Sequence, residues 1–155
     1  MPPHEDDQAI NNDQRLWRAL PNWTTAKEGR ERPKSEALTD SSYENSCFVE
    51  GEITLEEVVA FLLAGAQQQE DEILMKLIEQ GLPFAVLPVG LIREAGFILE
   101  RRPEEAEGCA NPNAHVVVGP PEEIRRKEYE RAAKKIVKHE TVTIVRAAPV
   151  ARPGR

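Results

Sequence analysis

The chain is poor in the residues on which many functional sites are built. Its 155 residues include two cysteines and three histidines, and aromatic side chains make up 5% of the total. Cys47 and Cys109 cannot form the disulfide framework of a small secreted domain, so we expect free thiols in a reducing, cytoplasmic protein. His4, His115 and His139 leave no set of ligands at the spacing that a zinc site needs. We therefore expect no metal and no cofactor.

Long apolar runs and an excess of positive charge are also missing. The longest apolar run, Phe84 to Ile92, is far shorter than the roughly 20 residues that span a bilayer. Met1 to Glu5 lacks the basic start and apolar middle of a leader peptide. The formal net charge is −7, whereas nucleic acids and anionic membranes bind clustered cations. We therefore expect no membrane partner, and nucleic acid is disfavoured.

The most regular apolar patterns lie between Ile53 and Leu99. Thr54 opens a capping box, and the apolar residues that follow recur at helical spacing, which predicts a helix over Thr54–Leu63. A second helix is predicted over Glu70–Gln80, because Gly81 and Pro83 form a normal stop signal. Short strands are predicted at Phe84–Val89 and Phe97–Leu99, the first either at a sheet edge or ending at Pro88, which cannot donate to a ladder.

Further elements are predicted on either side of this region. Ser46–Val49 and Ala114–Val118 are apolar and rich in strand formers. A long helix is predicted over Pro121–His139, with acidic residues in its first turn and basic residues in its last turns. Thr141–Val145 alternates at period two, as a half-buried strand does. The last strand, helix and strand fit a right-handed parallel crossover, and an antiparallel pairing of the two strands is the alternative.

These elements predict one α+β domain, in which a mixed sheet of short strands is packed by about three helices. We place this domain at residues 14–146, with a disordered acidic tail at 1–13 and a second tail at 147–155. Leu16, Trp17 and Leu20 are expected in the core, and Trp23 is expected to be a core anchor.

Candidate functional residues come mainly from the polar region between Arg30 and Ser46, because binding residues often lie on loops that a rigid scaffold positions. The candidate ligand-binding residues are Arg18, Arg32, Ser35, Ser46 and His115. His115 has two interpretations, a hydrogen-bonded structural histidine in an apolar strand or a side chain that faces a cleft. Cys47 and His115 are the only plausible nucleophile pair with a cysteine, although a cysteine in such a strand is usually a small core residue.

Five segments occur in an order that resembles a group of small bacterial proteins to which no activity is assigned. The segments are LWRALPNW (Leu16–Trp23), RPKSEAL (Arg32–Leu38), NSCFV (Asn45–Val49), GLIREAG (Gly90–Gly96) and NAHVVVG (Asn113–Gly119). A fainter likeness is to ADP-ribosyltransferase-like folds, which use an arginine on an early strand, a serine-led strand and a late glutamate. Arg18 and Ser46 match the first two, but the late strands lack a well-placed Glu-x-Glu.

The sequence favours a non-enzymatic accessory or protein-interaction domain within a bacterial multi-component system. The alternative is a small nucleotide-binding enzyme of ADP-ribosyltransferase-like type, built on Arg18, Ser46 and His115, and this alternative requires these side chains to converge. A third hypothesis, nucleic-acid binding, requires Arg101, Arg102 and the lysines of the last helix to share one face.

Overall fold

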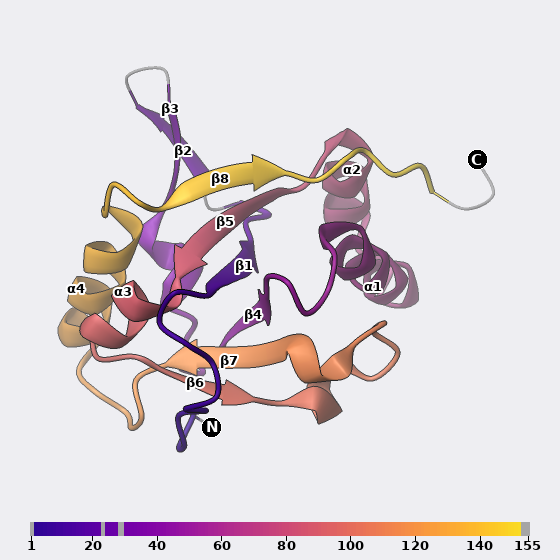
Figure 1. Ribbon diagram of the computed structural model, residues 1–155. Helices are drawn as coiled ribbons and strands as arrows, with labels where there is room; N and C mark the ends of the chain where they lie inside the picture. Colours follow the sequence, from indigo (N-terminus) through magenta and orange to yellow (C-terminus); the bar gives the residue numbers. More distant parts are fainter. Residues whose placement is uncertain (1, 23, 28–29, 153–155) are drawn as a thin grey trace.

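The computed structural model describes residues 2–22, 24–27 and 30–152, which form a six-stranded sheet with helices on both faces (Figure 1). The strand order is β6-β7-β4-β1-β5-β8, and β2 and β3 form a separate hairpin. The strands are β1 (Arg15–Ala19), β2 (Thr24–Lys27), β3 (Arg30–Pro33), β4 (Asn45–Val49), β5 (Pro83–Pro88), β6 (Ile98–Arg101), β7 (His115–Gly119) and β8 (Thr143–Arg146). The helices are α1 (Leu55–Gln68), α2 (Glu72–Gln80), α3 (Val89–Glu94) and α4 (Arg126–Val137), with short 3-10 turns η1 (Ser35–Leu38), η2 (Pro103–Ala106) and η3 (Pro112–Ala114).

The sheet separates two apolar clusters, because successive side chains of a strand point to opposite faces. Cys47 and Val49 of β4 join the cluster under α3 and α4, which we call the α4 face. Phe48, between them, joins the cluster under α1 and α2, which we call the α1 face. All five residues of β7 are buried. The core is therefore a three-layer structure, with α1 and α2 on one side of the sheet and α3 and α4 on the other (Figure 1).

The α+β class is confirmed, and so are the helices of the central region. Thr54 caps α1 with a complete capping box, as predicted. Asp71 caps α2 by accepting a hydrogen bond from the amide of Leu74, and Gly81 ends α2 with a φ of 103° that favours glycine. The last helix is shorter than predicted, because it begins at Arg126 rather than at Pro121.

The last two strands run parallel within one sheet, as the predicted crossover requires, but they do not pair with each other. β7 lies between β6 and β4, whereas β8 pairs with β5 at the other end of the sheet. The connection through α4 therefore joins two strands that have β4, β1 and β5 between them, instead of two neighbours. Every strand pairing in the described sheet is antiparallel, where a mixed sheet was expected.

The N-terminal segment, expected to be a disordered tail, is packed against the domain over residues 2–13. Ile10 is completely buried in the α4-face cluster. The amide of Asp7 donates to the carbonyl of Leu99 over 2.7 Å, and the Asp6 carboxylate accepts from the amide of Leu99 over 3.0 Å. Arg93 donates to the carbonyl of Ile10 over 2.7 Å. This segment therefore covers the outer edge of β6.

The C-terminal segment is also packed, as far as residue 152. Ala147 continues the pairing of β8, since its amide donates to the carbonyl of Leu82 over 2.9 Å. The amide of Val150 reaches the carbonyl of Ile78, and Arg152 forms an ion pair of 2.9 Å with Glu72. Local composition made this segment look like a tail, but the contacts with α2 order it.

A polar network fixes the loop before β4 against the α4 face. The Asn45 amide nitrogen donates to the carbonyl of Val118 and to the hydroxyl oxygen of Tyr129, both over 2.9 Å. The Tyr129 hydroxyl in turn donates to the carbonyl of Asp40 over 3.0 Å. The backbone passes so close at the end of β7 that a Cβ on Gly119 would overlap the carbonyl oxygen of Tyr43.

In the described part of the chain, no helix has the length and apolar character needed to cross a membrane.

If residues 2–13 belong to the folded domain, truncating Ile10 should destabilise it. Ile10→Ala removes a fully buried side chain, so we expect the free energy of unfolding in urea to fall by about 2–4 kcal/mol. The matched control is Ile73→Ala on α2, whose side chain is 66% exposed and whose loss should change stability by less than about 0.5 kcal/mol. Equal, small effects of the two substitutions would contradict the packed N-terminal segment.

Candidate functional site

Two of the predicted residues, Ser46 and His115, meet on the α1 face of the sheet. β4 and β7 pair with Ser46 opposite Val117 and Phe48 opposite His115, which sets the two polar side chains on a diagonal of one face. The Ser46 hydroxyl and Nε2 of His115 form a short hydrogen bond. Ser46 is exposed, whereas His115 is 2% exposed. A reachable hydroxyl is therefore paired with a shielded imidazole.

The other ring nitrogen of His115 fixes the tautomer. Nδ1 lies 2.8 Å from the carbonyl oxygen of Arg102, and a carbonyl only accepts hydrogen bonds, so Nδ1 carries the proton. In the neutral ring, Nε2 then has a free lone pair and accepts from the Ser46 hydroxyl. The Phe48 ring packs against the imidazole with its centroid 5.3 Å away.

A cluster of charged residues lies next to this pair. The guanidinium of Arg102, at 10% side-chain exposure, contacts Glu100 over 2.6 Å, Glu44 over 2.7 Å and Glu105 over 3.2 Å. Burial by itself would raise the pKa of Glu44 and of Glu100, but hydrogen bonds and the charge of Arg102 outweigh it and leave each pKa below its ordinary 4.5. The same carboxylates raise the pKa of Arg102. The cluster therefore stays ionised and carries more negative than positive charge.

The Arg18 side chain lies on the α4 face, where it donates hydrogen bonds to backbone carbonyls. Its side chain alternates with that of Trp17, which packs on the α1 face. The Arg18 guanidinium donates to the carbonyl of Ala37 over 2.9 Å and to the carbonyl of Ser46 over 2.8 Å. Arg18 thus ties η1 to β4 from beneath, and its guanidinium does not converge with the Ser46 and His115 side chains.

The remaining candidates lie elsewhere. Arg32 on β3 lines a hollow of about 470 Å³ together with residues of β8, and one of its guanidinium nitrogens is buried with no hydrogen-bond partner among the described residues. Ser35 begins η1, which contacts α4. The five predicted binding residues therefore do not form one site. Trp23 lies outside the described residues.

The cysteines are free and buried. Cys47 points to the α4 face, away from His115, so the two cannot act as a nucleophile and base. Burial raises the pKa of the Cys47 thiol to about 12, which leaves almost no thiolate at neutral pH. Among the described residues, no group of three or more His, Cys, Asp or Glu side chains could hold a metal ion.

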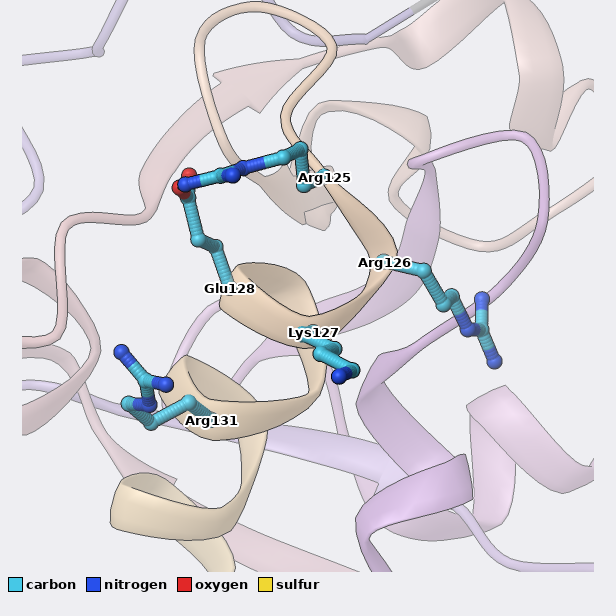
Figure 2. Close-up of a pocket in the computed structure, with 5 residues that line it drawn as sticks. All are labelled: Arg125, Arg126, Lys127, Glu128 and Arg131. Carbon is cyan, nitrogen blue, oxygen red and sulfur yellow. The ribbon is translucent and has the colours of Figure 1, made fainter.

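α4 carries a charged surface that the predicted binding residues do not include. Residues 125–138 carry seven Lys or Arg and two Glu, in a chain whose net charge is −7. Arg125 pairs with Glu128 over 2.8 Å, and Arg126 donates to the carbonyl of Thr39 over 3.0 Å. Figure 2 shows these two side chains turned in different directions around a hollow of about 390 Å³ at the start of the helix.

Four cations of this helix, Lys127, Arg131, Lys134 and Lys135, have no such contacts within the described part of the chain, and three of them are aligned. Lys127, Arg131 and Lys134 are exposed and line the hollows along α4, and none of them forms an ion pair within the described part of the chain. Their spacing of four and three residues places them in one row on the helix surface. We call this row the α4 stripe. The signal was the run of lysines and arginines, which the sequence analysis read mainly as a favourable helix end.

The cations Arg101 and Arg102 do not extend this stripe. Arg101 pairs with Asp7 over 2.6 Å and with Glu52 over 2.7 Å, and Arg102 is engaged by three glutamates. Their charges are already neutralised by the protein itself. The nucleic-acid hypothesis needs these groups to be available, and the ion pairs count against it.

Comparisons with known proteins give no relative: no family model, no curated protein and no solved structure matches this chain. The resemblance to a group of small bacterial proteins stays a prediction.

The carboxylates around Arg102 should make stability depend on acid. Because the folded pKa of Glu44 and of Glu100 lies below the ordinary 4.5, their contribution is present above that pH and is lost as the pH falls through the lowered values. Arg102→Met should cost about 3 kcal/mol at neutral pH, since it leaves carboxylates without their partner. It should also flatten the loss of stability in acid, measured by urea unfolding at several pH values. Arg15→Met, which removes an exposed pair with Glu50, is the control and should change little.

The Cys47 thiol should be inert in the native protein. In a Cys109→Ala variant at pH about 8, a thiol with a pKa of about 12 has a thiolate fraction of about 10⁻⁴, and burial blocks the reagent. We expect reaction with a disulfide reagent within minutes only after unfolding in guanidinium. Rapid reaction of the folded variant would show that β4 opens or that the thiol is accessible.

Proposed function

We propose that this protein is a cytoplasmic interaction domain that binds an acidic segment of a protein partner through the α4 stripe. The observation that carries the proposal is a row of unpaired cations on an acidic molecule. Residues 55–80, on the opposite side of the sheet, hold six acidic residues and one lysine, so positive charge is concentrated at α4. Charge complementarity therefore favours a negatively charged partner at this helix.

Geometry supports a peptide-sized contact. Lys127 and Lys134 are seven residues apart, which corresponds to about 10 Å along the helix axis. Carboxylates at helical or extended spacing on a partner segment match such a row. Each exposed ion pair contributes only about 0.2–1 kcal/mol, so we expect a weak complex that depends strongly on salt.

A protein partner is favoured over nucleic acid by the charge of the rest of the molecule. A nucleic acid extends its phosphates well beyond the seven cations of residues 125–138, over a molecule whose formal net charge is −7. Glu122 and Glu123, which are exposed just before α4, narrow the positive area further. An acidic protein segment can end where the stripe ends.

An accessory role in a bacterial multi-component system is the setting we propose for this domain. Two observations support this role. The α4 stripe is exposed, and the Arg18 guanidinium does not meet the Ser46 and His115 side chains. The ADP-ribosyltransferase-like alternative requires that convergence.

The test compares two double charge reversals of equal size. Lys127→Glu/Lys134→Glu alters the stripe, and Lys34→Glu/Lys76→Glu alters exposed lysines elsewhere. Binding to a fluorescent 20-residue polyglutamate peptide is measured by anisotropy at low and at physiological salt, with single-stranded DNA and RNA of equal length as competitors. We expect the first variant to bind at least about tenfold more weakly, which corresponds to about 1.4 kcal/mol, and the second to bind nearly as the parent does.

Equal loss in both variants would show that only net charge matters and would overturn the stripe as a recognition surface. Tighter binding of either nucleic acid than of polyglutamate would replace the proposed partner class. Absence of any measurable peptide binding at low salt would also reject the proposal.

A further inference from the structure

The hydrogen-bonded pair on the α1 face suggests a chemistry separate from the α4 stripe. We propose that Ser46 is a nucleophile, activated by His115, that accepts an acyl group from small uncharged esters. Serine becomes nucleophilic when a base within hydrogen-bonding reach removes its proton and a third group orients the base. Ser46, His115 and the Arg102 carbonyl have this relation.

The tautomer of His115 leaves the lone pair of Nε2 directed at Ser46. Because Nδ1 donates to the carbonyl of Arg102 over 2.8 Å, Nε2 is left as the acceptor that faces the Ser46 hydroxyl. The opposite tautomer would point a proton at the serine and could not take one. The backbone of the neighbouring strand therefore sets the imidazole in the state that a general base requires.

The two side chains of the pair differ in their exposure to solvent. His115 is 2% exposed and lies against Phe48, so bulk water has little access to the ring and its orientation is fixed by packing. Ser46 is exposed, so an electrophile can approach its hydroxyl directly.

The reaction balances without another reactant. The Ser46 oxygen attacks the carbonyl carbon of an ester, and its proton moves to Nε2 of His115. The tetrahedral intermediate collapses, the bond to the alkoxide breaks, and the alkoxide leaves as an alcohol with the proton from Nε2. Water, activated in the same way, then releases the acid and restores the serine.

The surroundings restrict the acyl donor. Glu44, Glu100 and Glu105 gather around the Arg102 guanidinium beside the pair, and these three carboxylates repel anionic donors such as acyl phosphates. The half-buried Trp17 belongs to the apolar cluster of the same face. A small uncharged ester fits these surroundings better than a charged thioester of a nucleotide carrier does.

The test uses a fluorophosphonate probe and p-nitrophenyl acetate on the full chain. Attack of Ser46 on the phosphonate forms an O–P bond and expels fluoride, and the added mass is located by peptide mapping. We expect one label, at Ser46, and a stoichiometric burst of p-nitrophenolate. Ser46→Ala should abolish both signals, whereas Ser41→Ala, which removes another exposed serine, should leave them unchanged.

His115→Gln tests the base. Loss of a general base typically slows such a reaction by about 10²–10⁴-fold, so we expect labelling to slow by at least about 100-fold. If that variant does not fold, Ser46→Ala, whose side chain is exposed, decides the matter with its circular dichroism and melting temperature as checks. Labelling of Ser46 no faster than of Ser41, a label that persists in Ser46→Ala, or equal rates in a folded His115→Gln would each overturn the proposal.

Discussion

A sheet that is covered on both faces leaves little solvent for polar groups in its central strands, and this constraint governs the structure. Each polar side chain that enters the sheet must find its partner inside the protein, because an unpaired buried group costs about 1–3 kcal/mol. Asn45 satisfies the constraint through Val118 and Tyr129, and Arg18 through two backbone carbonyls. The demand for internal partners therefore fixes the loops as well as the strands.

The same constraint separates the two candidate surfaces. β4 presents alternate residues to opposite faces, so the Ser46 side chain meets His115 on one face while its carbonyl is held by Arg18 from the other. Arg18 acts as a structural support for the strand that carries the serine. The α4 stripe lies on the far side of the sheet from the Ser46 side chain, so recognition and chemistry, as proposed, occupy different faces of one core.

Short-range sequence patterns predicted the helices, whereas contacts between distant segments determine the strand order and the packing of the termini. The capping box at Thr54 and the stop signal at Gly81 and Pro83 involve residues close together in the chain, which is why α1 and α2 were recognisable from sequence. The partners of β7 and β8 depend on segments far along the chain, and no local pattern encodes them. Ile10 lies in an acidic segment with few apolar residues, so no periodic pattern in the sequence predicted its burial. Pro120 and Pro121 suggested a helix start, but the Tyr43 hydroxyl, by binding the carbonyl of Ile124 over 2.8 Å, holds that stretch outside the helix.

Ser46 and His115 were each proposed from sequence, whereas their meeting required the register of β4 on β7.

Charge is distributed unequally between the two sides of the sheet. Six acidic residues lie with one lysine across residues 55–80 on one side of the sheet, and seven cations lie with two glutamates across residues 125–138 on the other. These opposite charges on the two sides of the sheet contribute an electric dipole component that runs across it. In the field of a charged neighbour the molecule experiences a torque before contact, and diffusion brings it in with one preferred end foremost.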